Sequence, residues 1–297
     1  MSKKPCVAII GIGKWGKNIL NSLSKKDVSI KYCLHSGSNS SKKWLKENYP
    51  KITDADNYDV VLTDTDICTV FIATPINTHF DLAMKALRSN KNVFLEKPAG
   101  GNIEDIRTLT REAVNRNLIL AVGYIFVHHP ILNEIKYLVS TKDIKGIYFE
   151  WNKWGTFSES IDLNLLTHEI SILKTLGLKI DYKSVMFMQM NNLLNLSAKS
   201  ATGADISIYI NRLSSDKRKS ITIITTKGTY VWLNNELWKS TDESSPEILL
   251  KSTGNALDLE LDTFLDCIKT KKTPVVDGIF SEEILTTLLH LRDAKPR

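Results

Sequence analysis

The sequence predicts an α/β protein in two domains, with a doubly wound parallel sheet followed by a largely antiparallel open sheet. Apolar strand-like segments alternate with helical segments up to about residue 123, which is typical of a parallel sheet with helices on both faces. Beyond that point strand follows strand with few helices, which indicates antiparallel pairing. At 297 residues the chain is long enough for two domains that each bury a core.

The first predicted strand and the turn after it carry the strongest motif. Cys6–Ile10 forms an apolar run, and Gly11, Gly13 and Gly16 follow in the pattern Gly-x-Gly-x-x-Gly before a helix from Lys17. The first glycine permits a tight turn, the second lets a pyrophosphate approach the backbone, and the third lets helix pack on strand. The helix N-terminus then faces the phosphates. Strand before and helix after favour a Rossmann dinucleotide site, and an incidental glycine turn is the alternative.

The end of the second predicted strand, residues 28–34, bears on the choice of dinucleotide. An acidic residue often stands at this place and binds the ribose 2′-hydroxyl of NAD. Residues 35–43 contain Ser36, Gly37 and two lysines but no acid. Without a carboxylate there is no repulsion to exclude a 2′-phosphate. The sequence therefore favours NADP and leaves NAD open, while a polar turn before the next helix would explain the same residues.

The rest of the first domain continues the alternation of strands and helices. Further strands are predicted at residues 66–74, 91–98 and 118–122. Helices are predicted at residues 41–48, 77–89 and 103–117. The last helix should bury four apolar side chains, those of Ile103, Ile106, Leu109 and Val114. The carboxyl ends of parallel strands form the ligand-binding edge, and Thr74, Lys97 and Tyr124 all stand at such ends.

The second domain is predicted from a change in pattern. Strand-like segments lie at residues 145–154, 183–190, 205–212, 220–226 and 229–233. Three helices are also predicted, at residues 162–176, 256–269 and 281–291. Residues 225–229 have the composition of a hairpin connection, and Asp162 is the expected N-cap of the first of these helices. A boundary near Gly123 gives domains 1–123 and 124–297.

Composition excludes several classes of function. A formal charge of +6 spread along the chain gives no basic stripe for nucleic acid, and no apolar run reaches the length of a membrane span. Residues 1–5 are basic but show no cleavable signal pattern. The four cysteines lack metal-ligand or redox spacing, so we expect reduced thiols in a cytoplasmic protein and no metal site.

Four stretches together resemble the Gfo/Idh/MocA family, named after glucose-fructose oxidoreductase, inositol dehydrogenase and rhizopine catabolism proteins. They are residues 11–16, 73–79, 96–98 and 163–173, and their order and spacing match the family over nearly the whole chain. In that family the Glu-Lys-Pro stretch, here residues 96–98, closes the strand that faces the nicotinamide. Residues 123–130 resemble the segment that leads into the second domain, and Ser36-Gly37 resembles the strand end of NADP-using members.

The resemblance implies an NAD(P)-dependent oxidoreductase that acts on a sugar or nucleotide-sugar. It implies a dinucleotide-binding first domain, and a second domain that binds substrate and supports a homo-oligomer, a dimer or tetramer. The implied cofactor contacts are Gly11, Gly13, Lys14, Trp15, Gly16, Ser36, Gly37, Thr74, Pro75, Glu96 and Lys97. The implied substrate contacts are Tyr124, Asn164 and His168.

Lys97 and His168 are the candidate catalytic residues. Hydride transfer with a nicotinamide needs a positioned cofactor, a proton carrier and stabilisation of charge on the substrate oxygen. Histidine suits proton transfer because imidazole titrates near neutral pH, and a lysine can donate a hydrogen bond to that oxygen. A surface lysine and a core histidine are the structural alternatives. Tyr124, His128 and His129 are reserve candidates at the domain junction, and each of them has a structural alternative.

Asn164 is the position at which the chain departs from the family pattern. The family commonly has an aspartate there, one helical turn before the histidine. Asparagine can orient an imidazole or hold a hydroxyl, but it carries no charge. A non-catalytic dinucleotide sensor is therefore the alternative function. We expect His79 to cap or pack a helix, and Trp151 and Trp154 to pack in a core or interface or to stack on a sugar or base.

Overall fold

The computed structural model describes residues 4–155 and 159–294, so the first three residues of the basic N-terminal stretch lie outside it. The chain divides into two compact units. The first comprises the residues up to Tyr124 together with Leu257–Glu283, and the second comprises Ile125–Ala256 and the residues from Ile284 onwards. The prediction that residues 124–297 form one domain is therefore wrong, because a C-terminal segment returns to the first unit.

The first unit contains a six-stranded parallel sheet in the order β3-β2-β1-β4-β5-β6. The strands are β1 (Cys6–Ile10), β2 (Ser29–Leu34), β3 (Thr53–Asp54), β4 (Ile67–Ile72), β5 (Asn92–Glu96) and β6 (Leu120–Gly123). The order runs outward in both directions from β1 and β4, which confirms the predicted doubly wound sheet. The switch point at β1 and β4 puts the glycine turn in the middle of the sheet edge.

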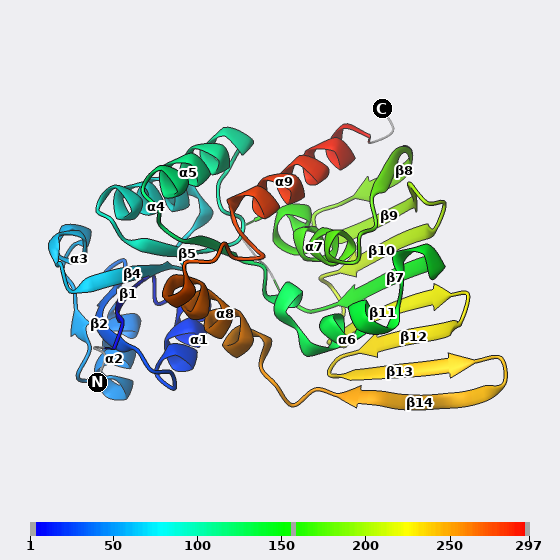
Figure 1. Cartoon of the computed structure of the whole chain (residues 1–297), viewed down its shortest axis with the longest axis horizontal. Coiled ribbons are helices and arrows are strands. Elements are labelled where there is room, and N and C mark those ends of the chain that lie inside the picture. Colours follow the sequence, from blue (N-terminus) through cyan, green and yellow to red (C-terminus); the bar gives the residue numbers. More distant parts are fainter. Residues whose placement is uncertain (1–3, 156–158, 295–297) are drawn as a thin grey trace. The chain divides into compact units, whose positions relative to one another are not determined.

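Helices cover both faces of this sheet. They are α1 (Lys14–Leu23), α2 (Asn39–Asn48), α3 (Tyr58–Thr63), α4 (His79–Arg88) and α5 (Ile103–Asn115), with a 3₁₀ turn η1 (Ile76–Thr78) before α4. Figure 1 shows α4 and α5 on one side of the sheet and α1 on the other. Val114 is 72% exposed, contrary to prediction, because Ala113 occupies the buried position of α5 one residue earlier.

Helix α8 (Ala256–Thr270) explains why the C-terminal segment belongs to the first unit. The ring of Phe264 lies 5.5 Å from the rings of Phe71 and Phe94, which belong to β4 and β5. Lys26 pairs with Asp262 at 2.7 Å, and α8 lies on the same side of the sheet as α1 (Figure 1). The first unit therefore completes its core with residues that the chain supplies about 130 positions later than β6.

The second unit is built on an eight-stranded sheet in the order β14-β13-β12-β11-β7-β10-β9-β8. The strands are β7 (Ile144–Asn152), β8 (Ile180–Gln189), β9 (Leu193–Ser200), β10 (Asp205–Asn211), β11 (Arg218–Thr225), β12 (Gly228–Leu233), β13 (Glu236–Thr241) and β14 (Ser244–Lys251). Only β7 and β10 pair in parallel, so the predicted largely antiparallel sheet is confirmed. The predicted hairpin joins β11 to β12, where Thr225 pairs with Gly228.

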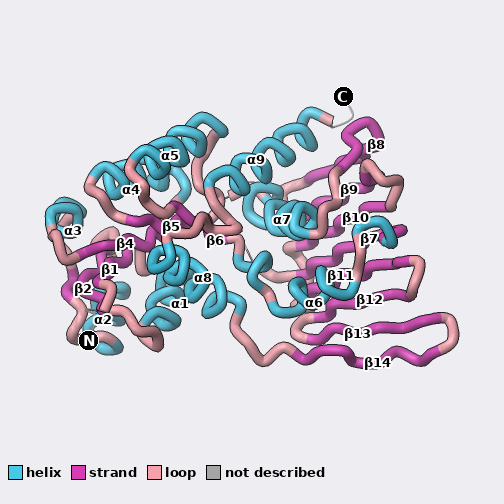
Figure 2. Tube along the Cα trace, in the orientation of Figure 1, coloured by secondary structure: helices cyan, strands magenta, loops and turns pink. Residues whose placement is uncertain are grey.

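Helices cover one face of the second sheet. They are α6 (Pro130–Leu138) and α7 (Thr167–Thr175), together with the turns η2 (Ile125–His128), η3 (Thr141–Asp143) and the π-helical η4 (Asp162–Leu166). Figure 2 shows α6 and α7 over the same face, and alternate residues of β9 and β10 are buried. The last helix, α9 (Gly278–Asp293), begins in the first unit and ends in the second.

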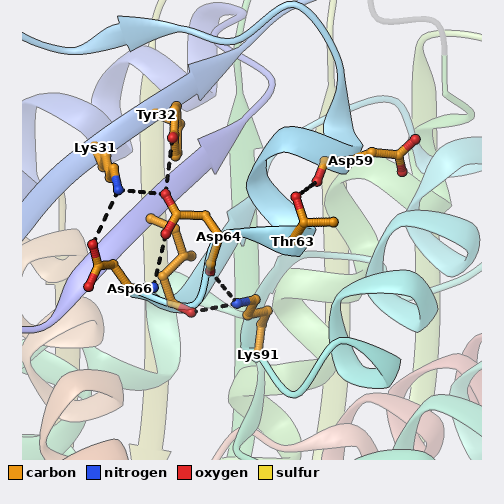
Figure 3. A network of polar contacts seen from close by, with 8 residues as sticks. Lys31, Tyr32, Asp59, Thr63, Asp64, Asp66 and Lys91 are labelled. Atoms are coloured by element: carbon orange, nitrogen blue, oxygen red, sulfur yellow. Dashed lines mark hydrogen bonds and ion pairs between the residues drawn. The ribbon is translucent and has the colours of Figure 1, made fainter.

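A polar network ties the starting ends of the strands in the first unit (Figure 3). Lys31 of β2 pairs with Asp64 at 2.6 Å and with Asp66 at 3.3 Å, just before β4 begins. The ammonium of Lys91, just before β5, donates to the backbone oxygens of Asp64 (2.7 Å) and Ile67 (2.8 Å). Since the strands are parallel, this network lies at the sheet edge opposite the glycine turn. We therefore assign it a structural role and no role in ligand binding.

Candidate active site

The three glycines of the turn after β1 differ in what a side chain would meet at each position. Gly11 has φ +91°, and a side-chain Cβ there would lie 2.5 Å from the backbone oxygen of Ala73. A Cβ at Gly16 would lie 1.8 Å from the oxygen of Gly11. A Cβ at Gly13 would meet nothing within 4 Å. Gly11 and Gly16 are therefore required by the packing of the turn, whereas the position of Gly13 keeps space open above it.

The N-terminus of α1 fits a pyrophosphate. Its N-cap is Gly13, which offers no side chain to the first N–H groups, and the first turn contains no acidic residue. Those N–H groups and the positive end of the helix dipole thus face the open space at Gly13. The residues present are what a dinucleotide would need at this place. Helix α1 begins at Lys14 and not at Lys17 as predicted, because the turn reaches helical conformation directly after Gly13.

Trp15 connects the glycine turn to the end of β5. Its indole N–H donates to the carboxylate of Glu96, and its side chain is 38% exposed. A Cβ at Gly123 of β6 would lie 2.9 Å from the same carboxylate, so a larger residue there would displace the Glu96 side chain. Burial raises the pKa of Glu96 to about 7, against the lowering effects of Trp15 and Lys97. Two predicted cofactor contacts, Trp15 and Glu96, are therefore brought together by the fold.

Helix α8 adds a carboxyl group that sequence reasoning missed. Glu260 is 2% exposed, and neither of its carboxylate oxygens has a hydrogen-bond partner among the described residues. Burial and the nearby charge of Glu96 both raise the pKa of Glu260. No local signal in the sequence could have joined Glu260 to Glu96, because α8 follows the whole second sheet along the chain.

The ends of β4 and β5 are held together by His79. One ring nitrogen, Nε2, lies 2.8 Å from the backbone oxygen of Thr74, and the other, Nδ1, lies 2.9 Å from that of Pro98. The side chain is 2% exposed, so the predicted packing role is confirmed. Thr78 also bonds Thr74, at 2.7 Å between their hydroxyl oxygens. The segment that carries Lys97 is thereby fixed at the ligand-binding edge of the sheet.

The end of β2 differs in one respect from the sequence prediction. Ser36 and Gly37 are exposed, and Gly37 has φ +83° and donates its N–H to Nδ1 of His35 at 3.0 Å. The other ring nitrogen of His35 lies 3.0 Å from Asp54 of β3. An acid is thus present near this strand end, although none occurs in residues 35–43. It was missed because the pairing of β2 with β3 brings it there.

In the second unit His168 lies within an aromatic cluster. The imidazole is 8% exposed, and its centre lies 5.1 Å from the Phe126 ring, perpendicular to it, and 5.7 Å from the Trp151 ring. Trp232 extends the cluster, 6.2 Å from Phe126 and 4.5 Å from His129. Trp151 packs as predicted. Phe126 and Trp232 were missed, since only the folded positions of η2 and β12 bring them into this cluster.

The helix before His168 is not the regular one that the sequence predicts. Residues Asp162–Leu166 form a π-helical turn, in which the N–H of Thr167 bonds the oxygen of Asp162. Asn164 therefore does not stand one α-helical turn from His168, and its amide donates to Glu159 at 3.4 Å. Asp162 is not the N-cap. Burial would raise its pKa, but the ion pair with Arg292 at 2.6 Å helps to hold it below the usual value.

Several candidate residues have structural roles. Tyr124 is 1% exposed, with its hydroxyl 3.5 Å from that of Ser281, so it is a core residue and not the predicted substrate contact. Trp154 is 70% exposed, which rules out the core among its predicted roles. Burial lowers the pKa of His128 to about 4, and burial with the charge of Lys219 lowers that of His129 to about 4. These histidines are poor proton carriers near neutral pH.

A pocket of about 430 Å³ opens beside the aromatic cluster in the second unit. Phe126 and His129 form one wall, and Asn235 and the polar loop 252–255 contribute to the rest. Aromatic faces with amide and hydroxyl groups suit a polar ring such as a sugar or a base. Lys97 belongs to the first unit and His168 to the second. No set of three metal-binding side chains occurs among the described residues.

The fold and the glycine turn define a class of protein, a Rossmann-type dinucleotide-binding unit joined to an open-sheet unit. Residues 6–124 match the family model GFO_IDH_MocA, described as an oxidoreductase family with an NAD-binding Rossmann fold. The match covers the dinucleotide-binding region, and it agrees there with the Gfo/Idh/MocA resemblance seen in the sequence. No helix in the described ranges has the length and apolar character needed to cross a membrane.

Named relatives are similar to this chain over different lengths. A dTDP-3,4-didehydro-2,6-dideoxy-alpha-D-glucose 3-reductase of Streptomyces violaceoruber is 36% identical over 92 residues, which cover 31% of this chain and 27% of the relative. A UDP-N-acetylglucosamine 3-dehydrogenase of Acidithiobacillus ferrooxidans is 24% identical over 257 residues, 80% of each chain. Its crystal structure superimposes with a TM-score of 0.88 at 18% identity, covering 99% of this chain and 98% of the other.

A third similarity concerns a structure with ligands. A variant of a 3-ketoreductase from Actinomadura kijaniata, in complex with TDP-benzene and NADP, superimposes with a TM-score of 0.85 at 13% identity. The match covers 99% of this chain and 98% of the other. At these identities the structural matches establish the fold alone.

Proposed function

We propose that the chain is an NAD(P)-dependent oxidoreductase that acts on a sugar or nucleotide-sugar. The observation that carries the proposal is the uncapped N-terminus of α1, with open space at Gly13 and with Lys97 at the end of β5. The named activities of the relatives support the substrate class. The direct test is to follow nicotinamide absorbance with UDP- and dTDP-linked sugars in both directions. No turnover with any of them, with dinucleotide bound, would contradict it.

Lys97 and His168 are the proposed catalytic residues. When bound, the nicotinamide supplies or accepts the hydride. Lys97 donates a hydrogen bond to the substrate oxygen and stabilises negative charge on it, while His168 takes up or returns the hydroxyl proton. The rings of Phe126 and Trp151 limit the water around His168 and fix its orientation. Asn164 remains a proposed substrate contact, through an amide group that binds hydroxyls.

A dinucleotide sensor is the second candidate. The observation that favours it is Asn164, which lies in a π-helical turn and donates to Glu159, so His168 has no carboxylate at the family position. The two functions differ in one measurement. A sensor binds dinucleotide and shows no turnover with any nucleotide-sugar. In a sensor, alanine at Lys97 or His168 therefore has no turnover to lower.

NADP is the proposed cofactor, and Ser36 provides a test. Replacing Ser36 with aspartate adds a carboxylate that repels a 2′-phosphate and accepts a hydrogen bond from a 2′-hydroxyl. The wild-type protein should bind NADPH more tightly than NADH, and Ser36→Asp should reverse that order. Titration of both nucleotides by calorimetry measures it. Thr65→Asp, an exposed change in a loop at the opposite sheet edge, is the control and should leave the order unchanged. Equal affinities before and after the Ser36 change would contradict the proposal.

We propose that the chain assembles as a homo-oligomer through its second sheet. Met186, Met188 and Met190, in and just beyond β8, are 68%, 48% and 64% exposed, and such apolar clusters are typical of contact surfaces. Light scattering after gel filtration should give the mass of a dimer or tetramer. Met186→Lys combined with Met190→Lys should lower that mass, whereas Tyr137→Lys on α6 should not. A monomeric wild type would refute the assembly.

The proposed location is the cytoplasm. All four cysteines are free thiols, and Cys33 and Cys267 are buried. Free buried thiols persist in a reducing compartment.

A further inference from the structure

A buried ion pair lies next to His168 and has no part in the proposed chemistry. Glu169 of α7 is 0% exposed, and its carboxylate lies 3.3 Å from the ammonium of Lys219 on β11. Neither group has any other hydrogen-bond partner among the described residues. Such a pair stabilises a fold less than well-packed apolar side chains would, because both charges lose their hydration. Its presence calls for a reason other than stability.

The ammonium of Lys219 contacts the same two rings that enclose His168. It lies 3.4 Å from the centre of the Phe126 ring and 3.9 Å from that of the Trp151 ring. These two rings lie 5.8 Å apart and perpendicular to each other. A cation on the face of an aromatic ring is attracted to it, more strongly where water is excluded. Lys219 thus holds both rings at once.

The acidic residues nearest to His168 in the chain are Asp162 and Glu169. Asp162 pairs with Arg292 at 2.6 Å, and Asn164 carries no charge. Glu169 is the carboxylate adjacent to His168 in the chain, and its ion-pair partner is Lys219. The ion pair therefore links the first turn of α7, which bears His168, to strand β11, which bears Lys219.

We propose that Lys219, anchored by Glu169, is a positioning residue that holds the rings of Phe126 and Trp151 around the imidazole of His168. The proposal rests on the proposed role of His168 in proton transfer. A ring that shifts by about 1 Å is enough to lower a rate about a hundredfold, because proton transfer depends on the orientation of the imidazole. Lys219 itself need not touch the substrate.

The test replaces Lys219 with methionine, which keeps the length of the apolar stem and removes the charge. The ring-proton resonances of His168 should shift in the NMR spectrum, because their position depends on the ring currents of Phe126 and Trp151. The chain has six histidines, and the spectrum of His168→Gln identifies which signals belong to His168. With a turned-over sugar, kcat should fall about tenfold or more while dinucleotide affinity stays within about a factor of two. Lys219→Arg, which keeps a cation on the rings, should recover most of the rate.

Lys199→Met is the matched control. Lys199 also belongs to the second sheet and pairs with Asp205 at 2.5 Å, but both side chains are about half exposed, and β10 separates β9 from β7, which carries Trp151. It should change neither the His168 resonances nor kcat. Unchanged His168 resonances in Lys219→Met would overturn the proposal, whether or not turnover is found. If the resonances shift in Lys219→Met as expected but the wild type turns over no sugar, the proposed function is contradicted and the positioning role of Lys219 is not.

Removing one partner of a buried pair can prevent folding, so two further measurements keep the proposal testable. The double variant Lys219→Met with Glu169→Gln removes both charges together and should fold with the same shifted resonances. In the wild type, burial lowers the pKa of Lys219 to about 8, against the raising effect of Glu169. The His168 signals of the wild type should therefore shift near pH 8, where Lys219 loses its proton. This lies well above the pKa of His129, which is about 4. A folded double variant whose His168 resonances match those of the wild type would overturn the proposal.

Discussion

Replacing Lys97 with methionine is expected to lower kcat at least about a hundredfold, because the substrate oxygen loses the hydrogen bond that stabilises its negative charge. Dinucleotide affinity should change little, since the phosphates rest on the N-terminus of α1 and not on this side chain. Single-turnover kinetics with the active nucleotide-sugar measure the first effect, and calorimetric titration with NADPH measures the second. His168→Gln should show the same split, through loss of the proton carrier.

Lys85→Met serves as the control for Lys97, because Lys85 is exposed on α4 of the same unit. It should alter neither kcat nor dinucleotide affinity. Normal turnover in both Lys97→Met and His168→Gln would remove these residues from the mechanism and favour other groups at the ligand-binding edge. Loss of dinucleotide binding in Lys97→Met would show either that Lys97 holds the dinucleotide, as the family resemblance implies, or that the substitution disturbs the strand end, where His79 bonds Thr74 and Pro98.

Alanine at Gly16 is expected to have the second large effect, on both stability and dinucleotide binding. The added Cβ would lie 1.8 Å from the oxygen of Gly11, closer than two non-bonded atoms can approach, so the turn or α1 must move. Overpacking of this kind costs about 1–3 kcal/mol or more, and the displaced N–H groups can no longer meet a pyrophosphate. Thermal unfolding and NADPH titration should show a lowered Tm and an affinity reduced at least about tenfold.

Gly13→Ala is the matched comparison, because its Cβ would meet no protein atom within 4 Å. The fold should keep its Tm to within about 2 °C, since nothing in the protein is displaced. Dinucleotide affinity should still fall, because the methyl group occupies the space in which the backbone meets the phosphates. Wild-type affinity in Gly13→Ala would show that the ligand does not approach this residue. A wild-type Tm in Gly16→Ala would contradict the geometry of the turn.

Local patterns predicted most elements of the fold correctly, whereas β3, β9, β13, β14, α3 and α6 were not predicted. The apolar run of β1 and the alternation in β10 identify strands by themselves. Strand β14 is mostly exposed, contains Pro246 and lies at the edge of the second sheet, so its sequence resembles a loop and only pairing with β13 makes it a strand.

The residues of the candidate site that stand in short sequence motifs were predicted, and those brought in by distant segments were not. The glycine turn, Lys97 and His168 stand in short motifs, and the structure places the first two at the ligand-binding edge of the parallel sheet and the third in a shielded cluster. Tyr124 also stands at a strand end, but contacts with Phe280 and Ser281 from α9 bury it. A strand end therefore predicts access to ligand only where no later segment covers it.

The sequence by itself determined the doubly wound sheet, the glycine turn and the family, because these depend on spacing along one stretch of chain. The tertiary structure alone decided which charges meet. Lys219 reaches the rings of Phe126 and Trp151, Asp54 reaches His35, and α8 brings Glu260 near Glu96. Each of these contacts joins residues from elements far apart in the chain, and a buried charge is tolerated only through the particular partners that folding supplies. Periodicity records which side chains are buried, but it carries no information about which distant side chain each one meets.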